Sequence, residues 1–122
     1  MPAVCTAKFI ERKQWFVAGD YAGFIYVYNY NTMHKVRSFR AGGTHITSLA
    51  VHPTQPYVLS SSNDHQIKLW DWQKGWNCTR IFKGHKDIVW QVMFNPKDSN
   101  TFASVSDDQH VKVVLFFFSW NF

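Results

Sequence analysis

The residues of this 122-residue sequence best suited to chemistry are six histidines, two cysteines and several serines and aspartates. Their spacing argues against both catalysis and metal binding. The histidines form no His-Glu-x-x-His motif, and no cysteine–histidine pairs stand at the separations of a zinc site. The sequence also lacks a Gly-x-Ser-x-Gly turn, a P-loop and a Gly-x-Gly-x-x-Gly motif. We therefore predict a protein that is not an enzyme, with no catalytic residues, metal site or cofactor.

The chain repeats itself with a period of 42 to 43 residues. Residues 4–9 align with residues 46–51, and these align in turn with residues 89–94. The second copy ends in Trp70-Asp71, and a Gly-His dipeptide at 84–85 opens the next copy. A period of roughly 40–45 residues is typical of WD40 repeats, which build the four-stranded blades of β-propellers. The sequence therefore resembles the WD40 family.

Alternating β-branched and aromatic residues in each copy predict strands, and no segment has the pattern of a helix. We expect strands at 4–9, 15–18, 25–30, 36–40, 46–51, 57–61, 66–71, 78–82, 89–94, 102–105 and 110–118. The expected fold class is all-β, a fragment of a WD40 β-propeller with two nearly complete four-stranded blades and part of a third. The repeats should occupy residues 1–112, with blades at about 4–40, 46–82 and 89–115.

The last ten residues depart from the repeat. Val114 and Leu115 stand where the second copy has Trp70 and Asp71, and mostly apolar residues follow. We interpret residues 113–122 as an aberrant hydrophobic tail of a truncated and divergent chain. The apolar run at 113–118 is too short to span a bilayer. An open arc of blades would also leave sheet edges and apolar faces in water.

The recurring polar residues predict a structural network within the blades. In WD40 blades, the histidine of Gly-His, a strand serine, a turn aspartate and the strand tryptophan bond in sequence. Ser60, Asp64 and Trp70 supply three of these in the second copy, where Gly42 replaces the histidine. The third copy supplies the histidine, serine and aspartate, but Val114 replaces the tryptophan. These three residues of the third copy are His85, Ser104 and Asp108.

Four motifs narrow the resemblance further. They are Asn-Tyr-Asn-Thr at 29–32, Val-His-Pro-Thr-Gln-Pro at 51–56, Lys-Leu-Trp-Asp-Trp at 68–72 and Phe-Asn-Pro-Lys-Asp at 94–98. In this order they resemble the N-terminal propeller of coatomer β′ subunits, above all the plant forms, from about Val4 to Lys112. The resemblance implies a scaffold and cargo-recognition role in the COPI coat, in transport between Golgi and ER. It also implies a cytoplasmic protein, peripheral on Golgi membranes and COPI-coated vesicles, whose partners are other coatomer subunits and dilysine-bearing membrane cargo tails.

The resemblance also locates a cargo site, and this chain departs from it. Acidic contacts of the family align with Thr44 and Asn63, and a basic contact aligns with Cys5. None of the three residues keeps the charge that would pair with ligand lysines or a terminal carboxylate. We therefore expect the dilysine site to be degraded.

The net charge of +5 leaves other functions open. A basic protein can bind nucleic acid, but these cations are scattered, with no run of four and no RNA-binding motif. We therefore expect no nucleic-acid partner, while a weak cationic nucleic-acid binder and a non-functional truncated gene product stay as alternatives. Cys5 and Cys78 fit no Cys-x-x-Cys pattern, which favours a reducing, intracellular compartment.

Overall fold

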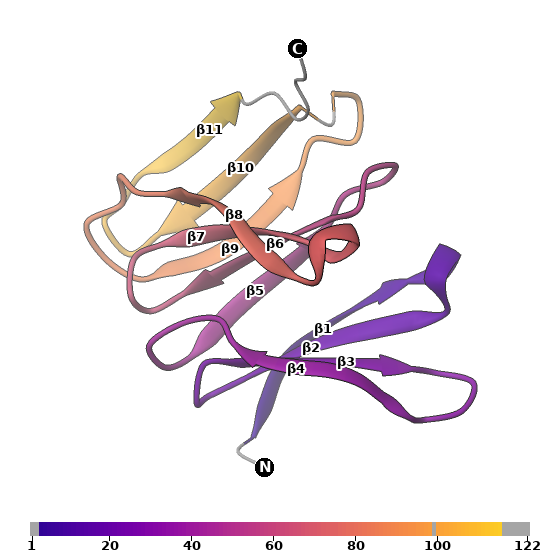
Figure 1. Ribbon diagram of the computed structural model, residues 1–122. Helices are drawn as coiled ribbons and strands as arrows, with labels where there is room; N and C mark the ends of the chain where they lie inside the picture. Colours follow the sequence, from indigo (N-terminus) through magenta and orange to yellow (C-terminus); the bar gives the residue numbers. More distant parts are fainter. Residues whose placement is uncertain (1–2, 99, 116–122) are drawn as a thin grey trace.

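The computed structural model describes residues 3–98 and 100–115, which form three antiparallel sheets in chain order (Figure 1). Blade 1 contains β1 (Val4–Ile10), β2 (Trp15–Asp20), β3 (Phe24–Asn29) and β4 (Lys35–Arg40). Blade 2 contains β5 (Ile46–Val51), β6 (Tyr57–Ser62), β7 (Ile67–Asp71) and β8 (Asn77–Phe82). Blade 3 contains β9 (Val89–Phe94), β10 (Thr101–Ser106) and β11 (Val111–Leu115). In each blade, strands that follow one another in the chain are hydrogen-bonded neighbours.

The fold class predicted from the sequence is confirmed, with two four-stranded blades and a third of three strands in the described residues. The strand predicted at 110–118 begins one residue later, at Val111, and runs to Leu115; positions 116–118 of the prediction lie outside the described residues. Two 3₁₀ turns, η1 (Glu11–Lys13) and η2 (Trp72–Lys74), are the helical segments of the described part. None of the helical segments described has the length and apolar character needed to cross a bilayer.

The first strands of the three blades lie side by side, β1 against β5 and β5 against β9. This arrangement stacks each sheet on the next (Figure 1). Two buried apolar clusters fill the spaces between the sheets. Val17 of blade 1 and Val58 of blade 2 lie in the first cluster, and Leu59 and Phe102 lie in the second, all fully buried. Burial of these faces is the main stabilising term of a stacked-sheet fold.

Arg12 fastens blade 1 to the loop that follows β5. Its guanidinium donates hydrogen bonds to the carbonyl oxygens of His52, Pro53 and Gln55, at 3.3, 3.1 and 2.6 Å. The same group lies 4.9 Å from the ring centroid of Trp72. A single cation from η1 therefore holds two segments of blade 2 in place.

Candidate ligand-binding face

The third blade brings together the three polar residues that the repeat pattern singled out. The His85 ring lies 2.7 Å from Ser104 Oγ through Nε2 and 2.8 Å from Asp108 Oδ2 through Nδ1. This is the atom order of a serine–histidine–aspartate triad. Ser104 and His85 are only 1% and 8% exposed, however, so a substrate has no access to the serine oxygen. The arrangement therefore ties the loop before β9 to the β10–β11 turn.

The Asp108 carboxyl is ionised within this arrangement. Burial alone would raise its pKa, but the backbone N–H groups of Lys86 and His110 donate to it, and the His85 ring bonds it as well. Together these bonds hold the pKa of Asp108 well below its usual range. The charge is therefore a fixed part of the turn at ordinary pH.

The second blade assembles only part of its expected network. Trp70 Nε1 donates a 2.9 Å hydrogen bond to Ser60 Oγ, and both side chains are buried. Asp64 takes no part in this pair, because its carboxylate bonds Ser62 Oγ and the Gln66 backbone N–H instead. Gly42 explains the difference. It lies against Ser62, where a Cβ on Gly42 would stand 3.0 Å from the hydroxyl oxygen, and it offers no histidine to link the serine with the aspartate.

The first blade contains a buried carboxylate that the sequence analysis missed. Asp20 is fully buried and accepts hydrogen bonds from the backbone N–H groups of Ala22 and Phe24, at 2.9 and 3.0 Å. The Tyr26 hydroxyl donates a third bond, at 2.9 Å. The position of Asp20 directly before the β2–β3 turn could have indicated this role, because an aspartate there commonly bonds the local backbone.

The three positions aligned with the family's cargo contacts lie close together in the structure. Exposed Thr44 donates a 2.5 Å hydrogen bond from Oγ1 to Asn63 Oδ1. Cys5 Sγ lies 2.9 Å from the carbonyl oxygen of Ile46, two residues after Thr44. We call the surface around Cys5, Thr44 and Asn63 the candidate ligand-binding face.

Cys5 has a structural role that its position in the repeat explains. Its thiol donates to the first residue of β5, and Thr47, 42 residues later, donates in the same way to the Val89 carbonyl that begins β9. Both residues therefore fasten one blade to the next. Burial, with the nearby Asp20 carboxylate, raises the pKa of the Cys5 thiol. It is a neutral donor to a carbonyl, not a cation for a carboxylate ligand.

A group of three aromatic rings in contact borders the same face, and the sequence analysis did not find it. The ring centroids of Tyr21 and His45 lie 4.4 Å apart, and those of His45 and Trp90 lie 5.9 Å apart. Tyr21 and Trp90 are 53% and 43% exposed. The three residues come from three blades and are far apart in the chain, so no local pattern indicates their contact.

Gly23 positions the loop that carries Thr44. Its carbonyl accepts hydrogen bonds from the N–H groups of Ala41 and Gly42, at 2.7 and 3.1 Å. Its φ is +90°, and a Cβ there would lie 2.5 Å from the Gly42 carbonyl oxygen and 2.6 Å from that of Thr44. Only glycine combines this backbone conformation with such a close approach.

Several basic side chains are already engaged within the protein. Arg40 bonds the Ala22 carbonyl at 3.0 Å and lies 4.6 Å from the centre of the Phe24 ring. Lys68 Nζ donates to the Ala41 carbonyl at 2.7 Å, and Arg80 lies over Phe82.

In the described part of the chain, no group of three or more potential metal-ligating side chains comes together.

Comparison with known proteins identifies the class to which this fold belongs. The model of the family described as "WD domain, G-beta repeat" matches residues 33–71 and 76–114, so the chain belongs to the WD40 repeat family. The structure also resembles the β-propeller domain of Myceliophteria thermophila Cps50 (Swd1), with a TM-score of 0.84 and 21% identity. The match covers 94% of this chain and 36% of that one, and it shows the propeller fold.

Several curated relatives are coatomer β′ subunits. The chain is 64% identical over 110 residues to a protein named as a coatomer β′-3 subunit in Oryza sativa subsp. japonica. It is 62% identical over 52 residues to coatomer β′-2 of Arabidopsis thaliana and 52% identical over 44 residues to coatomer β′ of Rattus norvegicus. The rice match spans 90% of this chain and 12% of the relative, and the other two span 43% and 36% of this chain and 5% of each relative. The resemblance predicted from the sequence motifs is confirmed.

Proposed function

We propose that this chain is a non-enzymatic scaffold module of the COPI vesicle coat. The observation that carries the proposal is the 64% identity to a coatomer β′ subunit across nearly the whole chain. The polar residues that could have suggested catalysis serve instead as buried connections between turns and strands. The module works in the cytoplasm, peripheral on Golgi membranes and coated vesicles, with other coatomer subunits as partners.

The module has lost the ability to hold a dilysine cargo tail. Thr44 and Asn63 are neutral and satisfy each other, and the Cys5 thiol is occupied by the Ile46 carbonyl. A hydrogen bond to a charged group contributes about 1.5–3 kcal/mol. Loss of three such bonds removes about 4.5–9 kcal/mol, most of the roughly 8 kcal/mol behind micromolar binding. The protein's net charge of +5 also repels a ligand with two ammonium groups.

Isothermal titration with a peptide ending in Lys-Lys-x-x and a free carboxylate tests the loss of cargo binding. The unmodified chain should show no measurable heat of binding at micromolar concentrations. The double variant Thr44→Asp, Asn63→Asp should recover measurable affinity, because each change returns one charge-assisted pair. Its matched control is Thr54→Asp, Asn77→Asp, which adds the same charge at two exposed positions away from this face, in the loop after β5 and at the start of β8, and should stay inactive. Micromolar binding by the unmodified chain would contradict this part of the proposal.

A chimera separates the scaffold role from cargo recognition. The matching 110 residues of the rice relative are replaced by those of this chain, and the hybrid is expressed in cells depleted of the native subunit. We expect it to join the coat on Golgi membranes and to fail in retrieving a dilysine-tagged reporter. The Thr44→Asp, Asn63→Asp hybrid should retrieve the reporter again. A hybrid that stays outside the coat although it is folded would contradict the scaffold role.

A further inference from the structure

Each blade has two faces, and the contacts between blades define them. Blade 2 turns a row of aliphatic side chains toward blade 3, and we call such a surface the outgoing face. This outgoing face of blade 2 packs against the facing surface of blade 3, which we call the incoming face. The outgoing row of blade 2 is Ala50, Leu59 and Leu69, and the incoming row of blade 3 is Phe94, Phe102 and Val114.

The contact between blades 1 and 2 uses the same positions of the repeat. Val17 and Val27 belong to the outgoing face of blade 1, and Val51, Val58 and Trp70 form the incoming row of blade 2. The incoming rows of blades 2 and 3 align residue by residue, 43 or 44 positions apart. Both interfaces are therefore formed by equivalent positions of the repeat.

Two faces of this kind have no partner within the described residues. The outgoing row of blade 3 is Met93, Ala103 and Val113, paired across β9, β10 and β11. Met93 and Val113 are 54% and 73% exposed, and Val111 on the same face is 71% exposed. Exposed apolar side chains that adjoin one another across neighbouring strands, rather than lying singly, mark an interaction surface.

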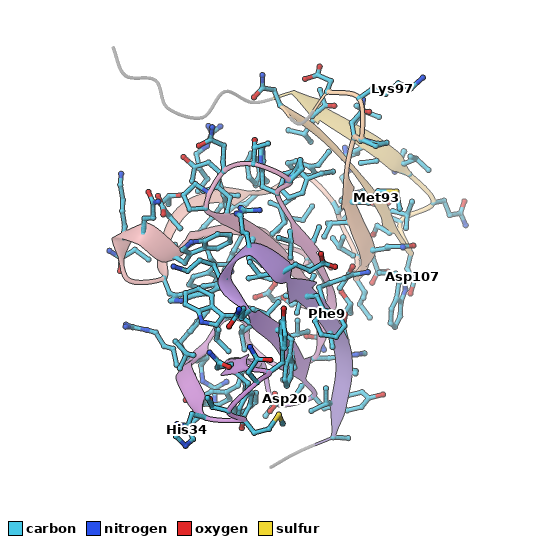
Figure 2. All side chains as sticks on the ribbon, turned by 90° about the vertical axis from the view of Figure 1, so that its right-hand side faces the viewer. Phe9, Asp20, His34, Met93, Lys97 and Asp107 are labelled. Atoms are coloured by element: carbon cyan, nitrogen blue, oxygen red, sulfur yellow. The ribbon has the colours of Figure 1, made fainter. Side chains whose placement is uncertain are left out.

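The incoming face of blade 1 is a row of aromatic rings. Phe9, Phe16 and Tyr28 stand 42 positions before Val51, Val58 and Trp70 and pair across β1, β2 and β3. The Phe16 and Tyr28 rings stack with centroids 5.4 Å apart, and Phe9 is 65% exposed. Figure 2 shows Phe9 on blade 1 and Met93 on blade 3, the inner-strand members of the two free rows.

We propose that the two free faces receive each other from a second copy of this chain. The outgoing face of blade 3 in one copy packs on the incoming face of blade 1 in the other. The pairing repeats the chemistry inside the molecule, where the aliphatic row of blade 2 covers the aromatic rings of Phe94 and Phe102. None of the six side chains in the two free rows is charged, so contact between the rows themselves buries no unpaired charge. Lys35, which pairs with Tyr28 across β3 and β4, is exposed on the outer strand of blade 1.

The repeat architecture also predicts the number of copies. The described part of each chain forms three blades, so two copies of it supply six, within the range of four to eight blades found in closed propellers. In such a pair blade 3 of each copy packs on blade 1 of the other, which gives a closed two-fold assembly that covers every free face of the described blades. Since each copy carries a charge of +5, added salt should favour association.

Light scattering after size exclusion tests the proposal on the full chain. The expected mass is twice 14.3 kDa. Phe9→Glu and Val113→Lys each charge one exposed free face, and each variant alone should give a monomer with unchanged circular dichroism. Val111→Lys provides a second variant of the outgoing face. The control Met33→Lys changes an equally exposed residue, 62%, in the turn after β3 and should leave the pair intact.

Mixing the two single-face variants gives the decisive result. Phe9→Glu keeps a good outgoing face and Val113→Lys keeps a good incoming face, so an equimolar mixture should form a one-to-one pair. Contact between like faces would give no such rescue. A folded wild-type monomer at about 100 μM, an assembly that survives either single substitution, or a mixture that stays monomeric would overturn the proposal.

Discussion

At the level of single residues, each of the three blades provides a different hydrogen-bond partner for a buried polar side chain. A polar atom buried beside a strand needs a partner, because leaving it unsatisfied costs about 1–3 kcal/mol. Asp20 bonds two backbone N–H groups and a tyrosine hydroxyl, Ser60 bonds Trp70, and Ser104 bonds His85. The repeat pattern indicated the second and third of these arrangements, because they use its own residue types. It missed the first, which uses residues foreign to the repeat.

The low pKa of Asp108 predicts how stability depends on pH. A carboxyl whose folded pKa lies below its ordinary value of about 3.9 stabilises the folded state above that pH. This contribution is lost as the pH falls below about 4 toward the folded pKa. Asp108→Asn should therefore lower the free energy of unfolding at pH 6 and flatten its decline between pH 5 and 3. Urea unfolding over a pH series measures both effects.

Asp107 provides the control for this experiment. It precedes Asp108 in the same turn, and its side chain is exposed. Asp107→Asn removes the same charge and should keep the acid-dependent decline of the wild type. An acid profile of Asp108→Asn that matches the wild type would show that the carboxylate does not stabilise the turn.

The tryptophan of the second blade should matter more than its serine partner. Trp70 is 7% exposed, and its ring centroid lies 4.7 Å from that of Phe39 in the cluster between blades 1 and 2. Trp70→Ala should cost roughly 3–5 kcal/mol, and Ser60→Ala about 1 kcal/mol. Thermal unfolding and protease resistance measure the difference. Equal resistance of the two variants would argue against the register of β6 and β7.

At the level of elements, the sequence repeat and the blade are offset by one strand. The matched family segment 33–71 contains β4 with β5, β6 and β7, although β4 is hydrogen-bonded into blade 1. Each repeat therefore closes the preceding sheet before it builds the next one. This overlap makes the packing of one blade depend on its neighbour.

Strand positions could be predicted from the sequence because their signal is local. Alternation and the proline-containing turns at 52–56 and 95–98 fixed most strand ends to within two residues of those observed. Contacts made through space left no such trace. The clamp of Arg12 on the 52–55 loop and the ring contact between Tyr21 and His45 depend on how blades meet, which periodicity does not encode.

The turn at Gly23 offers a test at this scale. Gly23→Ala places a Cβ 2.5 Å from the Gly42 carbonyl oxygen and forces a left-handed conformation on alanine. We expect a loss of about 1–3 kcal/mol in the free energy of unfolding. Gly75→Ala is the control, since φ there is also positive (+71°) but nothing stands within 4 Å of a Cβ. If both variants lose the same stability, the close approach at Gly23 is not the cause.

At the level of the whole molecule, three sheets stack into a propeller arc that presents one shared face. The candidate ligand-binding face, the fastening of one blade to the next and the two free faces all depend on this stacking. The repeats in the sequence indicated three blades. The neutral residues Cys5, Thr44 and Asn63 indicated that the candidate ligand-binding face lacks the charges of the family's cargo site. The sequence could not indicate which side of each blade is covered, because that depends on which rows meet across sheets.

Nuclear Overhauser contacts between aromatic rings of different blades test this stacking most directly. In the aromatic-labelled 122-residue chain, the Phe39 and Trp70 rings link blades 1 and 2 at 4.7 Å, and Phe82 and Phe102 link blades 2 and 3 at 5.0 Å. Both pairs should give strong cross-peaks. Cross-peaks between the paired strands of each sheet, without either contact between blades, would contradict the arc and every conclusion that rests on its shared face.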